Sequence, residues 1–116
     1  MEQTEAQYRI LKLIEENPEM TQRQLAEAMG VSLGKLNYIL RALIKKGLVK
    51  GRNFRNRKDK TYYAYLLTPK GIEEKARATL RFFRQVEAEY TVLKQEVESI
   101  VQDNHGSNRL NESDHD

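Results

Sequence analysis

The sequence predicts a mainly α-helical, α+β fold with one small β-hairpin. Apolar residues recur at helical spacing in several segments, and only 48–54 and 61–68 are rich in the β-branched and aromatic residues that suit strands. The chain has 116 residues and no cysteine, so it holds at most one modest domain and no disulfide scaffold. We expect a compact domain over 1–68, a long helix over 69–102 and a disordered polar tail over 103–116.

The first helix is predicted over 5–16. Its apolar residues recur at three-residue steps, as on the buried face of an amphipathic helix, at Tyr8, Leu11 and Ile14. Asn17 and Pro18 follow, and we expect them to end the helix because proline lacks the N–H that a helix interior needs.

Two shorter helices are predicted next. Thr21 and Gln24 have the spacing of a capping box, in which each side chain bonds a free backbone N–H at the helix start. Gly30 is expected to end this helix because glycine readily adopts the left-handed conformation of a tight exit. A second helix is predicted over 32–46, with a serine as its N-cap and Gly47 as its stop.

Residues 22–40 have the spacing of a helix-turn-helix motif. The small Ala26 falls where the two helices must cross closely, and Gly30 falls at the turn. Core positions of the second helix are taken by Val31, Leu36 and Ile39. A motif of this kind presents the outward side of its second helix to a partner.

Positive charge is concentrated in the middle of the chain, although the net charge of the whole is only +3. Residues 28–72 carry 11 basic side chains and the single acid Asp59, a net charge of +10, whereas 1–27 carry −3 and 73–116 carry −4. Such a block indicates either disorder or a polyanionic partner. Its apolar periodicity argues against disorder, so we expect a folded basic surface.

The outward side of the helix 32–46 suits the major groove of double-stranded DNA. Asn37 can form two hydrogen bonds with adenine, and Lys35 or Arg41 can reach guanine or phosphate. Tyr38 offers a hydroxyl for phosphate and a ring for a thymine methyl group. Any one of these residues could instead be an ordinary solvated side chain. The complete predicted face is Ser32, Gly34, Lys35, Asn37, Tyr38, Arg41 and Lys45.

The segments 48–54 and 61–68 are joined by a polar, mostly basic loop, which predicts a hairpin. Positive charges along 52–60 suit the phosphate backbone or a narrow minor groove. The alternative is a solvated turn. The predicted DNA contacts of this hairpin are Arg52, Arg55, Arg57, Lys58 and Lys60.

The last predicted helix starts at Pro69, with Thr68 as its cap, and extends to about residue 102. Apolar residues alternate four and three positions apart along it, which is the heptad pattern of a coiled coil. At 1.5 Å per residue the helix would be about 50 Å long, more than one small domain can cover. We therefore expect its second half to pair with a second copy through Phe83, Val86, Tyr90, Leu93, Val97 and Ile100.

Together, the first helix, the helix-turn-helix, the basic hairpin and the junction LLTPKG at 66–71 resemble the MarR family of winged-helix transcriptional regulators. The resemblance covers about residues 5–100 and looks closest to the EPS-associated subgroup, named for exopolysaccharide gene clusters. It implies a homodimer on a palindromic operator, with the recognition helix 32–46 of each copy in successive major grooves and the wings beside them.

Two features depart from the family pattern. Members usually carry an Asp-x-Arg pair in the wing, whereas here Asp59 is followed by Thr61 at the arginine position. The role of the wing arginine then passes to Arg55, Arg57 or Lys58. Typical members are also longer, with extra helices that build a pocket for phenolic effectors, so the resemblance leaves a small-molecule effector open.

Other functions fit the sequence less well. An enzyme is not expected, because His105 and His115 lie in the predicted tail and no phosphate loop, nucleophile motif, metal site or cofactor site is evident. No apolar run approaches the roughly 18 residues of a membrane span, and the N-terminus does not resemble a signal peptide, so a cytoplasmic protein is expected. The alternative is a winged-helix protein-interaction adaptor assembled through the C-terminal coiled-coil helix, which would not need the basic block.

Overall fold

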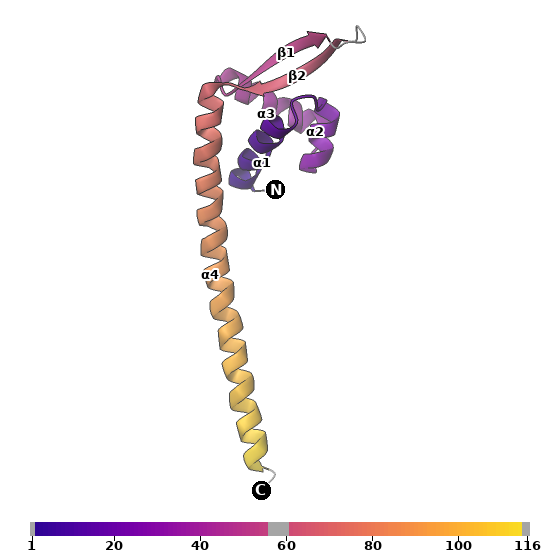
Figure 1. Ribbon diagram of the computed structural model, residues 1–116. Helices are drawn as coiled ribbons and strands as arrows, with labels where there is room; N and C mark the ends of the chain where they lie inside the picture. Colours follow the sequence, from indigo (N-terminus) through magenta and orange to yellow (C-terminus); the bar gives the residue numbers. More distant parts are fainter. Residues whose placement is uncertain (1, 56–60, 115–116) are drawn as a thin grey trace. The chain divides into compact units, whose positions relative to one another are not determined.

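The computed structural model describes the backbone of residues 2–55 and 61–114 and the side chains of 2–52 and 63–105 (Figure 1). The predicted mainly helical fold with a single hairpin is confirmed. The elements in chain order are α1 (Gln3–Glu16), α2 (Gln22–Met29), α3 (Leu33–Lys45), β1 (Val49–Arg55), β2 (Thr61–Leu67) and α4 (Pro69–Asp114).

The chain divides into two compact units, Met1–Phe82 and Phe83–Asp116. The first unit is built on a single apolar core between α1, α2 and α3, and β1, β2 and the first turns of α4 add to it. It extends beyond the predicted boundary at 68 because Ala78 of α4 is fully buried. The largest fully buried side chains are Ile10, Leu11, Ile14, Leu25, Met29, Leu36, Leu40 and Val49.

The predicted capping residues of α2 and α3 are confirmed. Thr21 Oγ1 accepts a hydrogen bond from the Gln24 N–H at 3.1 Å, and Gln24 Oε1 accepts one from the Thr21 N–H at 2.9 Å. Gly30 and Gly47 have φ of 69° and 76°, the left-handed conformation that favours glycine. These caps fix the short turn between α2 and α3 and the exit of α3 into the hairpin.

The hairpin is antiparallel, with Val49 opposite Leu67 and Arg55 opposite Thr61. Both strands agree with the predicted segments to within one residue. Tyr65 of β2 is 5 % exposed and packs in the core. The hairpin therefore extends from the same core that holds α3.

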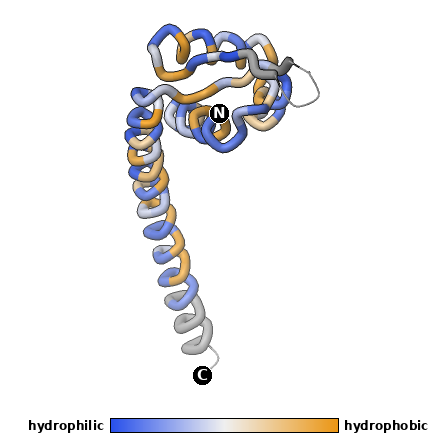
Figure 2. Tube along the Cα trace, turned by 45° about the horizontal axis from the view of Figure 1, so that its top comes forward, coloured by the Kyte–Doolittle hydropathy of each residue, from blue (hydrophilic) through white to orange (hydrophobic). Residues whose placement is uncertain are grey.

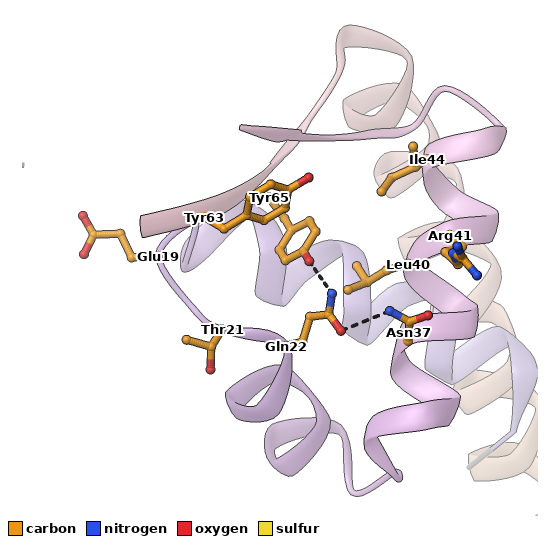
Figure 3. A pocket seen from close by; sticks show the side chains of 9 residues that line it. All are labelled: Glu19, Thr21, Gln22, Asn37, Leu40, Arg41, Ile44, Tyr63 and Tyr65. Carbon is orange, nitrogen blue, oxygen red and sulfur yellow. Dashed lines mark hydrogen bonds between the residues drawn. The ribbon is translucent and has the colours of Figure 1, made fainter. Parts of the chain in front are cut away.

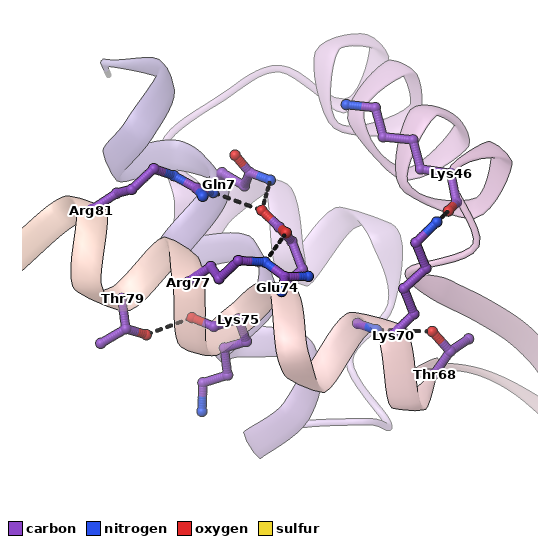
Figure 4. Close-up of polar contacts among 10 residues, drawn as sticks. Gln7, Lys46, Thr68, Lys70, Glu74, Lys75, Arg77, Thr79 and Arg81 are labelled. Atoms are coloured by element: carbon purple, nitrogen blue, oxygen red, sulfur yellow. Dashed lines mark hydrogen bonds and ion pairs between the residues drawn. The ribbon is translucent and has the colours of Figure 1, made fainter.

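The start of α4 is anchored on the turn after α3 (Figure 4). Thr68 Oγ1 accepts a hydrogen bond from the Gly71 N–H at 3.0 Å and donates one to the Gly47 carbonyl at 2.6 Å. Lys70 Nζ donates to the Lys46 carbonyl at 3.2 Å. Gly71 itself lies so close to the backbone of Leu48 that a Cβ there would overlap the carbonyl oxygen.

One carboxylate joins α1 to the first turns of α4 (Figure 4). Glu74 accepts hydrogen bonds from Arg81 Nη2 at 2.6 Å, Arg77 Nε at 3.1 Å and Gln7 Nε2 at 3.2 Å. The hydrogen bond from Arg81 lowers the pKa of Glu74, partial burial opposes this, and Arg77 lowers the pKa further. Close by, the rings of Tyr8 and Phe82 stack with centroids 5.0 Å apart.

The tail differs from the prediction. The backbone of α4 continues to Asp114, so the helix is longer than 69–102 and the segment predicted to be disordered is helical as far as that residue. A polar composition removes a packing face, but the segment contains no proline, and extending an existing helix adds a hydrogen bond without a new nucleation step. His115 lies outside the described residues.

Candidate nucleic-acid interface

Helix α3 has one buried and one exposed side. Leu36, Leu40 and Leu43 point into the core and are at most 5 % exposed. On the opposite side Tyr38 is 75 % exposed although it is a large aromatic residue. Of the predicted face, the residues that lie exposed are Ser32, Gly34, Lys35, Tyr38, Arg41 and Lys45.

The first turn of α3 is exposed to solvent. Ser32 Oγ caps the helix by accepting a hydrogen bond from the Lys35 N–H at 3.1 Å. A Cβ placed on Gly34 would meet no atom within 4 Å, and the backbone of Gly34 has no positive φ. No neighbour among the described residues requires glycine at this position, and the residue is exposed.

Asn37 is the exception on this face, because it is half-buried and belongs to a chain of hydrogen bonds (Figure 3). Asn37 Nδ2 donates to Gln22 Oε1 at 3.2 Å, and Gln22 Nε2 donates to the hydroxyl of Tyr65 at 2.6 Å. The chain joins α2, α3 and β2. Asn37 retains its carbonyl oxygen and a second amide hydrogen for another partner.

Gln22 was not among the residues predicted for the site. It is the first residue of α2, directly after the capping Thr21, and no local pattern marks it for a contact with α3 or with the hairpin. Its partners lie 15 and 43 positions away in the sequence. Only the folded arrangement brings these amides and the tyrosine hydroxyl together.

A shallow groove of about 680 Å³ runs beside this chain of hydrogen bonds, between α2, α3 and the hairpin (Figure 3). Polar and apolar side chains line it together, so it has neither the closed apolar wall of a small-molecule site nor a group of metal ligands. The lining residues are Glu19, Thr21, Gln22, Asn37, Leu40, Arg41, Ile44, Tyr63 and Tyr65. Among the described residues, no group of three or more histidine, cysteine, aspartate or glutamate side chains could hold a metal ion.

Much of the predicted wing lies outside the described part of the chain. Arg52 is exposed on β1, opposite Ala64 in the register. For Arg55 only the backbone is described, at the end of β1, and Arg57, Lys58 and Lys60 are not described. The exposed Lys50, which was not in the predicted set, adds a further positive charge to β1.

Among the side chains that the structure describes, no acidic residue forms an ion pair with a cation of α3. Within the described residues, the ion pairs join Arg9 to Glu5, Lys75 to Glu15, and Arg77 and Arg81 to Glu74. None of these pairs involves a lysine or arginine of α3 or β1. The basic charges of the exposed face therefore remain available to an anionic partner.

The first part of the chain is similar to a known family of domains. Residues 3–50 match the family described as winged helix-turn-helix DNA-binding. No curated protein matches the chain in sequence.

Solved structures of transcriptional regulators share the winged-helix fold. A PadR-like transcriptional regulator from Bacillus cereus superposes with a TM-score of 0.67 over 75 % of this chain and 89 % of its own, at 18 % identity. MarR from E. coli in its apo form gives 0.52 over 63 % and 53 %, at 29 % identity. The transcriptional repressor CouR, bound to a 23-mer DNA duplex, gives 0.52 over 64 % and 51 %, at 31 % identity.

The present winged-helix chain spans about half the length of MarR and CouR. These likenesses show that the chain shares the winged-helix fold. None of the described helices combines the length and apolar character that a membrane span needs.

Proposed function

We propose that this protein is a sequence-specific transcriptional regulator that inserts α3 into the major groove of double-stranded DNA. The observation that carries the proposal is the exposed face of α3, where unpaired cations and Tyr38 stand on a helix whose other side is locked in the core. A rigid helix of this kind holds several side chains in register with base edges and phosphates. The hairpin then lies on the adjacent phosphates or in the minor groove, with Arg52 among its contacts.

Asn37 reads a base in this proposal, and Gln22 positions it. Two hydrogen bonds from Asn37 to adenine require its carbonyl oxygen and one amide hydrogen, and these are the groups that the bond to Gln22 leaves free. The same bond fixes the orientation of the amide before DNA arrives. Gln22 therefore supports base reading without touching DNA.

The functional unit is a homodimer on a palindromic operator. Two copies present two copies of α3, which reach successive major grooves when they are about 34 Å apart, one turn of B-DNA. The exposed apolar residues of α4 supply the contact between the copies. The EPS-associated subgroup and a cytoplasmic location, both predicted above, complete the proposal.

The exposed apolar residues of α4 also fit the second candidate, a protein-interaction adaptor. An adaptor would assemble through the same helix but would have no use for unpaired cations on α3. Selecting bound fragments from a random DNA library separates the two. A regulator yields one consensus with twofold symmetry, whereas an adaptor yields none.

The salt dependence of binding gives a second test. A dimer that neutralises many phosphates releases their counterions, so affinity should fall steeply with salt, with on the order of ten ion equivalents per dimer. Binding that does not respond to salt would contradict the proposal.

A further inference from the structure

The second unit, from Phe83 onward, leaves an apolar seam uncovered. Its six apolar seam residues are between 43 and 62 % exposed. Figure 2 shows hydrophobic residues recurring along this part of α4 between hydrophilic ones. The described seam consists of Phe83, Val86, Tyr90, Leu93, Val97, Ile100 and Asn104.

The spacing assigns each seam residue to a heptad position. Phe83, Tyr90, Val97 and Asn104 take position a, and Val86, Leu93 and Ile100 take position d. Positions e and g flank such a seam and face a partner helix. Position e holds Glu87, Lys94 and Val101, and position g holds Glu89, Glu96 and Asp103.

A parallel partner makes these flanking charges complementary. In a parallel pair, a residue at g faces the residue at e five positions later on the other helix. Glu89 then faces Lys94 of the second copy, and symmetry provides this pair twice. Glu96 faces Val101, so no like charges meet among the described flanking residues. Asn104 at position a meets its own copy, an arrangement that favours two parallel strands.

An antiparallel partner makes the charges conflict. In that orientation, position g of one helix faces position g of the other, and position e faces position e. The register that buries all six apolar residues stacks Tyr90 on Leu93 and Val86 on Val97. It places Glu87 against Lys94 twice, but it also places Glu89 against Glu96 twice, so like charges offset the opposite ones, which does not happen in the parallel coil. A shift by one heptad in one direction sets Glu89 against its own copy. In the other direction, the shift sets Lys94 against its own copy.

We propose that residues 83–104 of two copies form a parallel, in-register, two-stranded coiled coil. The partner is a second copy of this chain. In a parallel coil the N-terminal ends of the two helices lie together, so both chains enter the coil at the same end. The inference rests on the homodimer of the proposed function, but it does not depend on DNA binding.

Single-cysteine variants test the orientation directly, because the natural chain has no cysteine. In the parallel coil, full-length Val86→Cys and full-length Val97→Cys should each form disulfide-linked dimers on mild oxidation, since each residue faces its own copy. Gln95→Cys, at position f on the far side, serves as the control and should stay unlinked. Linkage only after mixing the Val86→Cys and Val97→Cys proteins would demonstrate the antiparallel coil and overturn the proposal.

Glu89→Lys gives a second test, with opposite signs for the two orientations. In the parallel coil the side chain introduced by Glu89→Lys faces Lys94, and the dimer dissociation constant should rise about fivefold because two surface pairs are lost. In the antiparallel coil it would meet Glu96, and the dimer would tighten. Glu98→Lys makes the same charge change at position b, outside the contact, and should leave the constant unchanged.

Sedimentation equilibrium without DNA measures these constants. A tighter Glu89→Lys dimer, or a monomeric natural chain at micromolar concentration, would overturn the coiled coil and leave the DNA proposal to its own test. Failure to find a DNA consensus would leave the coiled coil standing.

Discussion

The two units of the chain treat their apolar side chains in opposite ways. In the first unit Leu11 and Leu36 are fully buried, and the exposed face of α3 is polar and basic. In the second unit Leu93 and Ile100 are 57 and 59 % exposed. The first unit is thus a complete fold whose surface suits a polyanion, whereas the second can bury its apolar residues only against another helix. The stability of the second unit should therefore depend on protein concentration, and that of the first should not.

Leu93→Asp should have the largest effect. It should abolish the dimer contact of the second unit and leave the first unit folded. It removes an apolar residue at position d and brings two carboxylates together in the seam, so the dimer dissociation constant should rise at least a thousandfold, about 4 kcal/mol. Sedimentation equilibrium measures this loss. Gln95→Asp adds the same charge on the far side of the helix and should leave the dimer intact. Equal loss in both variants would show that the seam is not the contact.

Gly71→Ala should lower the stability of the first unit and leave the contact between the second units unchanged. Its Cβ would overlap the carbonyl oxygen of Leu48, so α4 must shift from its anchor, and we expect a loss of about 1–3 kcal/mol in the free energy of unfolding. Urea unfolding measures this loss. A stability equal to that of the natural protein would contradict the close approach of these two segments.

Asn37→Ala and Arg52→Ala should separate base reading from phosphate contact within the first unit. Asn37→Ala should cost about 1–3 kcal/mol at one base pair of the operator and relax the preference there, whereas Arg52→Ala should weaken all sequences evenly. Arg41→Ala should resemble Asn37→Ala if Arg41 reaches a guanine. Titrations of each variant against the selected operator and against random DNA measure the loss of affinity for the specific and for the non-specific sequence. Equal losses on the two DNAs for Asn37→Ala would remove this residue from base reading.

Gln22→Ala provides the matched test of positioning. It removes the partner of the Asn37 amide without removing a proposed DNA contact, so it should weaken operator binding less than Asn37→Ala does. In the double variant Gln22→Ala/Asn37→Ala, the two losses should not add, because both act through one amide. Fully additive losses in operator affinity would show that Gln22 acts independently of Asn37.

Sequence patterns predicted what local spacing determines. The caps at Thr21, Gly30 and Gly47 and the strands of the hairpin follow from residue types within a few positions of one another. The contacts of Gln22 with Asn37 and Tyr65 do not, because the partners belong to different elements and any amide could have faced solvent.

Helix α4 shows the same limit. Its heptad pattern indicated an exposed apolar seam. It did not indicate that Ala78, on another face of the same helix, is fully buried in the core of the first unit. The polar composition of its end likewise indicated the absence of a packing face, and it did not determine whether the backbone stays helical.

Acid should weaken the link between α1 and α4 inside the first unit. The hydrogen bonds from Arg81 and Arg77 lower the pKa of Glu74 in the folded state, so their contribution to stability is present above the pKa of the unfolded chain. It is lost as the pH falls through the lowered folded pKa. Near neutral pH, Glu74→Gln should cost about 0.5–1 kcal/mol, as exposed ion pairs do, and this difference should shrink on acidification. Urea unfolding between pH 7 and pH 3 measures the difference, and a cost that does not change over this range would contradict the assignment.

Gly34→Ala has the smallest expected effect on folding and distinguishes the fold of the first unit from its function. Since a Cβ at this position meets no atom within 4 Å, alanine should fit without strain and stabilise α3 by about 0.5 kcal/mol through its better helix propensity. If the first turn of α3 approaches DNA closely, the same methyl group must weaken operator binding. A variant that is more stable and binds less tightly would show that glycine is kept here for the partner. A variant that gains stability and binds normally would place the first turn of α3 away from the DNA.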